Sequence, residues 1–205
     1  MVWNNKVSDN EAYAVGVNYG TSRYLAATTA PVNTLANISG YNPFIMTKYF
    51  AWTFQGEYMS TKITSSKDAA ANTDDQDHTP TGYNAMVVYK INDNWEGVVR
   101  YTSLDTDMRG QRISDGERGF AAAGPTGVAS LYDKSDAIYL GVNYYFNLEA
   151  LGQQVNGYNA KIQFGFERAK FKDVITQAST STLATGASQI GATVDVLRLQ
   201  AQVAF

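Results

Sequence analysis

The feature that most restricts how this chain folds is a set of long stretches in which apolar and polar residues alternate one by one. The clearest stretches span 94–104, 136–146, 157–170 and 191–205. In the last of them, Leu197 and Leu199 fall on one face, whereas Arg198 and Gln200 fall on the other. Strict alternation over about ten residues predicts a β-strand that separates two different environments.

Further strands follow from weaker versions of the same pattern. These candidates span 11–19, 22–30, 41–49, 52–61 and 80–90. Together the segments predict an all-β chain of roughly nine strands without a helix, arranged as a single domain over 1–205. If 41–61 is instead one long strand, the count becomes eight.

The predicted connections alternate between short and long. The short ones fall at Gly20–Thr21, Phe50–Ala51, 91–94 and 147–156. The long ones fall at 30–40, 62–79, 105–135 and 172–190. This order places tight turns at one end of the sheet and long polar loops at the other, which is typical of outer-membrane barrels.

Aromatic residues cluster beside the predicted short turns. They are Tyr19, Tyr24, Trp52, Tyr89, Trp95, Tyr145, Phe146 and Tyr158. Trp and Tyr prefer the headgroup level of a bilayer, and a tilted strand of about 9–11 residues is long enough to cross the hydrocarbon. Since hydrocarbon leaves no partner for an unpaired backbone group, strands there must close into a barrel. The pattern therefore favours a transmembrane antiparallel β-barrel over a soluble sandwich or a lipocalin-type barrel.

Composition excludes several other functions. The chain has no Cys and hence no thiolate metal site, and its net charge of −3 argues against binding nucleic acid. The single histidine, His78, lies in a polar segment and is expected to be a solvated loop residue. Without a second histidine, a nucleophile elbow or a phosphate-binding glycine loop, we predict no catalytic residue, no cofactor and no enzyme activity. The acidic runs 74–77 and 105–107 lack the full spacing of a calcium loop, so no metal site is predicted.

Four stretches in order resemble the phosphate-selective porin O and P family. They are Phe54–Met59, Trp95–Asp105, Leu140–Asn147 and the final strand Asp195–Phe205. The resemblance covers most of 41–205 and, more loosely, 2–30. It implies a 16-stranded barrel of the bacterial outer membrane, usually a homotrimer, that passes anions such as phosphate or other small hydrophilic solutes.

The resemblance also implies how this chain relates to a whole barrel. With roughly nine strands, the chain is expected to be the C-terminal half of such a porin or a shortened relative. No apolar signal-peptide core follows Met1, which fits a mature form or a fragment. Phe205, with Val203 and Ala201 on the same strand face, resembles the signal that the barrel-assembly machinery reads.

Turning the polar face inward defines the candidate pore-lining residues. They are Glu57, Glu96, Arg100, Lys161, Gln163, Glu167, Arg198 and Gln200. Asp195 is assigned to the same face, so the visible acids and bases nearly balance and a weakly selective pore is expected. The charged run 104–118 is expected to be an outer loop, with a loop folded into the pore as the alternative.

The leading hypothesis is thus a passive diffusion porin in contact with outer-membrane lipid. The main alternative is a small structural or adhesive outer-membrane barrel that does not conduct because its own side chains fill the lumen.

Overall fold

The computed structural model describes residues 2–8, 10–26, 34–65, 77–107, 131–146, 160–177, 181–183 and 191–203. Its strands are β1 (Val2–Lys6), β2 (Glu11–Ala26), β3 (Thr34–Tyr49), β4 (Trp52–Ser65), β5 (Thr81–Lys90), β6 (Trp95–Asp105), β7 (Leu131–Phe146), β8 (Ala160–Gln177), β9 (Ser181–Leu183) and β10 (Ala192–Val203). Within these residues, no helix has the length and apolar character needed to cross a membrane.

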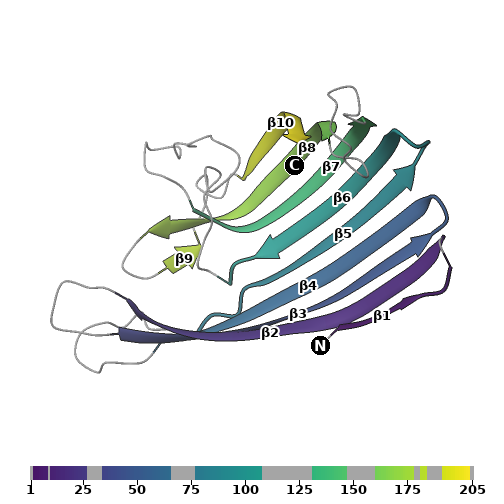
Figure 1. Cartoon of the computed structure of the whole chain (residues 1–205). Coiled ribbons are helices and arrows are strands. Elements are labelled where there is room, and N and C mark those ends of the chain that lie inside the picture. The colour runs from purple at the N-terminus through teal and green to yellow at the C-terminus, as the bar shows by residue number, and fades with distance from the viewer. Residues whose placement is uncertain are drawn as a thin grey trace.

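All ten strands belong to one antiparallel sheet that curls into an open trough (Figure 1). Each strand pairs with its neighbour in the chain, from β1 to β8, and β10 then pairs with β8. The short β9 also pairs with β8, beyond the β10 ladder. The all-β antiparallel fold class is therefore confirmed. Among the described residues no pairing joins β1 to β10, so the sheet is not closed.

The N-terminal strands differ from the predicted ones. Residues 11–19 and 22–30 were expected as two strands with a turn at Gly20–Thr21, but β2 runs without a break to Ala26. Gly20 and Thr21 lie inside the β2–β3 ladder, opposite Gly40 and Ser39. The prediction of a turn was wrong because glycine and threonine carry no apolar signal there, yet they continue the backbone pairing.

The turn at Phe50–Ala51 is confirmed and separates β3 from β4, which excludes a single strand over 41–61. Phe50 adopts a φ of 51°, the left-handed conformation that lets two residues reverse the chain. The turns Val7–Asn10 and Ile91–Asn94 lie at the same end of the sheet. The connections that include 27–33, 66–80 and 106–130 join strands at the opposite end, while 147–159 lie outside the described residues.

One face of the sheet, here called the convex face, is apolar and exposed across all the long strands. Cross-strand register aligns Phe54, Val87, Val99, Leu140, Phe166 and Leu197 in one row. Leu197 and Leu199 are 71% and 77% exposed, and Phe164 is 55% exposed. A continuous apolar face of this extent is unusual on a protein surrounded by water and marks contact with an apolar partner or with lipid.

Two rows of aromatic side chains border this apolar face. The short-turn row consists of Tyr49, Trp52, Tyr89, Trp95 and Tyr144. The loop-end row consists of Tyr19, Tyr41, Tyr58, Tyr83 and Tyr101. Ring centroids lie 4.5 Å apart for Trp52 and Tyr89, and 5.7 Å apart for Tyr83 and Tyr101. On β4, β5 and β6 the rows are six residues apart, or roughly 20 Å along the strand.

Some predicted aromatic positions need correction. Tyr19 lies opposite Tyr41, and Tyr24 lies opposite Ala36, so neither flanks a short turn. Tyr145 does lie near a short turn, but its side chain belongs to the opposite, polar face. Tyr158 lies outside the described residues.

The sheet has little buried core. A small cluster of Tyr132, Ala137, Ala169 and Phe171 packs at the loop end. Elsewhere the wall is stiffened by side chains that lie flat against it, above all Tyr139. A Cβ atom added at Gly141 or at Gly165 would collide with the Tyr139 ring, so both glycines are needed for the ring to lie against the sheet.

We expect Gly165→Ala to destabilise the folded sheet by about 1–3 kcal/mol, since the new methyl group pushes the Tyr139 ring off the wall. Gly20→Ala is the matched control, because nothing lies within 4 Å of the added atom. Urea titration of the refolded protein in lipid vesicles, followed by the folded band on unheated gels, measures the difference. Equal stability of the two variants would contradict the packing role of Gly165.

Candidate pore-lining surface

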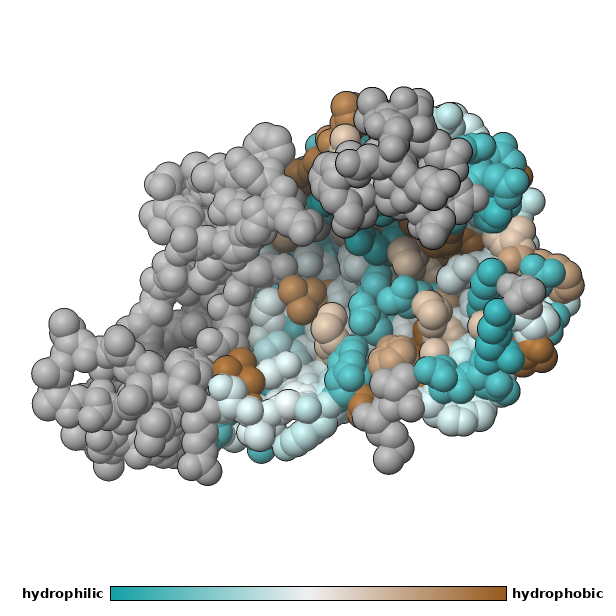
Figure 2. All heavy atoms as spheres, in the orientation of Figure 1, coloured by the Kyte–Doolittle hydropathy of each residue, from teal (hydrophilic) through white to brown (hydrophobic). Residues whose placement is uncertain are grey.

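The polar face of the sheet, here called the concave face, lines the hollow of the trough. Hydrophilic residues gather in this hollow in Figure 2. A cavity of about 440 Å³ lies on this face, and side chains from β5, β6, β7, β8 and β10 line it. The strands bring these residues together because alternate positions of neighbouring strands point to the same side of a sheet.

Six of the eight predicted pore-lining residues line this cavity. They are Glu96, Arg100, Lys161, Gln163, Arg198 and Gln200. Glu167 contacts two of these residues, Arg100 and Arg198, but its own side chain is only 2% exposed because it lies beneath them. Glu57 lies apart from them on β4, on the same face, where it accepts a hydrogen bond of 3.0 Å from Asn84. The sequence prediction thus grouped residues that the fold places side by side, except Glu57.

Three further polar residues of the cavity were not among the residues predicted to line the pore. Asn143 accepts a hydrogen bond of 2.8 Å from Gln163. Tyr145 donates a hydrogen bond of 2.7 Å to Glu96. Tyr139 lies between Arg100 and Glu167 in the cross-strand register. All three alternate with the apolar positions of 136–146, so the period-two pattern already contained the signal that could have identified them.

The centre of the surface is an ion cluster on three strands. Nη2 of Arg100 on β6 lies 3.5 Å from Oε2 of Glu167 on β8. Nη2 of Arg198 on β10 lies 3.1 Å from the same oxygen. The guanidinium of Arg100 also lies over the Tyr139 ring, 5.2 Å from its centroid, in a cation–π arrangement. Glu167 therefore lies beneath two cations that face the cavity.

The charges that face the cavity differ from those expected. Arg100, Lys161 and Arg198 line it, whereas Glu96 is the acid among the lining residues. Asp195 was assigned to this face, and that assignment was wrong. It alternates in step with Leu197 and lies on the convex face, where its carboxylate accepts two hydrogen bonds of 2.7 Å from Arg168.

The short-turn end of the concave face carries a second hollow of about 310 Å³. Its charged residues are Lys48, Lys90, Asp93 and Glu96. Lys90 lies 2.8 Å from Asp93 in the turn that follows β5. The hydrogen bond and the charge of Lys90 hold the pKa of Asp93 below its usual value. The Asp93 carboxylate therefore stays charged at this mouth of the trough at neutral pH.

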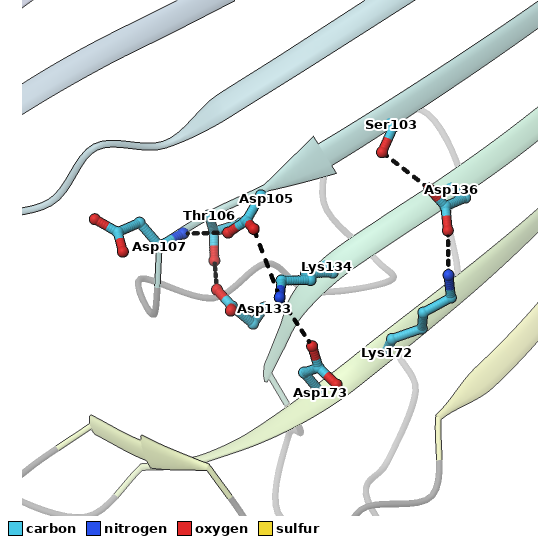
Figure 3. A network of polar contacts seen from close by, with 9 residues as sticks. All are labelled: Ser103, Asp105, Thr106, Asp107, Asp133, Lys134, Asp136, Lys172 and Asp173. Carbon is cyan, nitrogen blue, oxygen red and sulfur yellow. Dashed lines mark hydrogen bonds and ion pairs between the residues drawn. The ribbon is translucent and has the colours of Figure 1, made fainter.

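At the loop end, a polar network ties β6, β7 and β8 together (Figure 3). Asp136 accepts a hydrogen bond of 2.9 Å from Ser103 and pairs with Lys172. Lys134 lies between Asp105 and Asp173, at 3.6 Å and 3.4 Å. Each exposed pair is worth little alone, but the network links three strands beyond the aromatic row. Asp105, Asp136 and Asp173 therefore each contact a lysine, and the described residues contain no cluster of three metal-ligating side chains.

His78 is more constrained than the solvated residue expected from the sequence. Its Nδ1 atom lies 2.6 Å from the backbone carbonyl oxygen of Asp107. Its backbone exchanges hydrogen bonds of 2.8 Å and 3.0 Å with Ile63. His78 thus joins the end of β4 to the segment that follows β6. The remainder of the charged run 104–118, beyond Asp107, lies outside the described residues.

The proposed assembly signal is described only in part. Ala201 lies on β10 opposite Ile162, on the convex face. Val203 ends β10 opposite Ala160. Phe205 lies outside the described residues, so its predicted role stays a prediction.

Comparison with known proteins agrees with this two-faced sheet. The family model for phosphate-selective porin O and P matches residues 2–205, which is nearly the whole chain. No curated protein and no solved structure matches the chain. An all-β antiparallel sheet with an apolar convex face and a polar concave face is the wall that a porin requires. The chain belongs to the phosphate-selective porin O and P family.

Proposed function

We propose that this chain forms the wall of a passive diffusion pore in the bacterial outer membrane. The observation that carries the proposal is the separation of the two faces over the whole sheet. Exposed Leu, Val, Ile and Phe side chains occupy the convex face, and charged and amide side chains line the concave cavity. In an outer-membrane barrel, the first face contacts lipid and the second surrounds water.

The aromatic rows support the membrane placement. Tyr and Trp side chains border the apolar face on both sides, as do the aromatic girdles of outer-membrane barrels. We infer that the short turns face the periplasm and the long connections face outward, as in other outer-membrane barrels. Family membership likewise points to a channel rather than to an enzyme.

A pore requires closure of the sheet, and strand direction restricts how this happens. Nine strands form the main path and every neighbouring pair is antiparallel, so β1 and β10 run in the same direction. To close the barrel with antiparallel pairing at both edges, an odd number of further strands must be inserted between β10 and β1. The closed barrel then has an even number of strands in total. A homotrimer and the barrel-assembly machinery remain expectations from the family resemblance.

The permeating species are small hydrophilic solutes or ions. Guanidinium and ammonium groups on the cavity surface favour anions, whereas the buried carboxylate of Glu167 offsets part of that charge. We therefore expect a modest preference for anions. The alternative is a non-conducting structural barrel. The same ion cluster is compatible with it, because paired charged side chains can also fill the interior of a narrow barrel.

Thiol modification during bilayer recording tests the pore directly. Because the chain has no cysteine, an introduced one is its single thiol. In Gln200→Cys, a charged, water-soluble methanethiosulfonate reagent is expected to reduce the current, since Gln200 lines the cavity. Leu199→Cys, one residue earlier and 77% exposed on the convex face, is expected to be unaffected. Absence of current from the unmodified protein would favour the non-conducting barrel, and equal modification of both variants would contradict the assigned faces.

The same two positions give a test of stability. Leu199→Arg should cost about 2–4 kcal/mol if its side chain lies near the bilayer midplane, because a guanidinium is transferred into lipid. Gln200→Arg should leave the free energy of folding nearly unchanged and shift the current toward anions. Urea-dependent folding into vesicles measures the first effect, and the reversal potential in a salt gradient measures the second. Equal destabilisation by the two substitutions would refute the proposed orientation.

A further inference from the structure

The buried ion cluster of the concave face has a role beyond lining the wall. We propose that Glu167 is a positioning residue that sets ion preference by holding the guanidinium groups of Arg100 and Arg198 against the wall. This inference rests on the proposed pore function. It concerns a side chain that is 2% exposed and thus hardly meets a passing ion itself.

Register explains why both arginines converge on one carboxylate. Arg100 and Glu167 lie in the same cross-strand row, separated by Tyr139. Arg198 lies one row further toward the short turns, opposite Gly165. At Gly165 the Tyr139 ring occupies the space that a side chain would fill, while Arg198 reaches Glu167 from β10. Both Nη2 atoms reach Oε2, at 3.5 Å and 3.1 Å.

The cluster is poorly explained as a device for stability alone. A charge taken out of water loses hydration energy, and the attraction of its partners often no more than compensates that loss. An apolar residue at position 167 would pack against Val196, its neighbour on β10, without this cost. The carboxylate is better explained by its effect on the two arginines.

That effect concerns both position and charge. Arginine side chains are long and, without an anchor, extend into water. Here the Arg100 guanidinium lies over the Tyr139 ring and Arg198 contacts Glu167, with 38% and 29% of the two arginine side chains exposed. The two arginines thus do not narrow the proposed pore path, and the carboxylate offsets one of their two positive charges. A guanidinium group that already contacts a carboxylate is also less available to bind oxyanions from solution.

The convex face provides a matched pair for comparison. Asp195 and Arg168 also form a carboxylate–guanidinium pair, at 2.7 Å, but on the opposite side of the same strands β8 and β10. Substitutions there change the same chemical groups without touching the proposed water path. Asp195→Asn therefore controls for Glu167→Gln, and Arg168→Gln controls for Arg198→Gln.

The test is bilayer recording of the wild type and these variants, with sulfate as the probe. Glu167→Gln is expected to raise the chloride-to-potassium permeability ratio about fourfold, because one unit charge roughly 10 Å from the path in water changes the local anion and cation concentrations about twofold each, in opposite directions. It should also make the chloride current sensitive to sulfate, because released guanidinium groups bind oxyanions bidentately. Asp195→Asn should change neither quantity. Glu167→Asp, which keeps the charge, should restore ion preference and sulfate resistance toward the wild-type values.

Arg198→Gln gives a second route if Glu167→Gln does not fold. It leaves Glu167 paired with Arg100 and should lower the permeability ratio by a similar factor, while Arg168→Gln should not. Folding of each variant is checked by the folded band on unheated gels. If Glu167→Gln and Arg198→Gln conduct with wild-type selectivity and no response to sulfate, Glu167 only braces the wall and the inference is overturned. If the wild type itself carries no current, the proposed function fails and the inference fails with it.

Discussion

Backbone hydrogen bonding in a medium without water is the constraint on which the rest of this structure depends. In hydrocarbon, each amide and carbonyl group must find its partner within the protein. The chain meets this demand with consecutive antiparallel strands, each pairing with the next over ladders as long as Leu131–Phe146 against Ala160–Ile175. Because the ladders supply the order, side chains need not form a dry core between layers. They are free to match two different surroundings, one on each face.

The sequence predicts a strand of this fold well only where the two faces of the sheet lie in different surroundings. Where one face is apolar and the other polar, as in Trp95–Asp105 and Ala192–Val203, alternation identifies the strand and its facing. Where both faces are polar, the pattern vanishes although the pairing continues. Ser39 and Thr21 pair within a ladder that was predicted to be interrupted there. Similarly, β8 extends to Gln177 through a segment expected to be a loop from 172 onward. Hydrogen bonds between backbones do not depend on side-chain polarity, so composition cannot reveal them.

In the candidate site, alternation along each strand predicts which face a side chain occupies, whereas the pairing of the strands determines which side chains meet. The alternation of side chains along each strand correctly predicts that Arg100, Lys161 and Arg198 lie on one face. It predicts neither that Glu167 is buried nor which cations cover it, because that depends on how β6, β8 and β10 align. Burial also depends on the glycines beside Tyr139, which allow an aromatic ring to lie flat. Asp195 was misassigned for a simpler reason, since its own parity with Leu197 already places it on the convex face.

In the proposed pore, a wall that is one sheet thick couples stability to permeation. In a globular protein, residues that stiffen the fold lie in a core, apart from the residues that meet the ligand. Here Tyr139 packs on the wall, carries the Arg100 guanidinium and borders the cavity at the same time. Glu167 likewise contacts arginines from two other strands, and it lies beneath the surface whose charge it is proposed to set. Substitutions on the concave face must therefore be judged by folding and by conductance together, because the same contacts determine both. The convex face, which is proposed to contact lipid, separates the two effects and is the proper source of control variants.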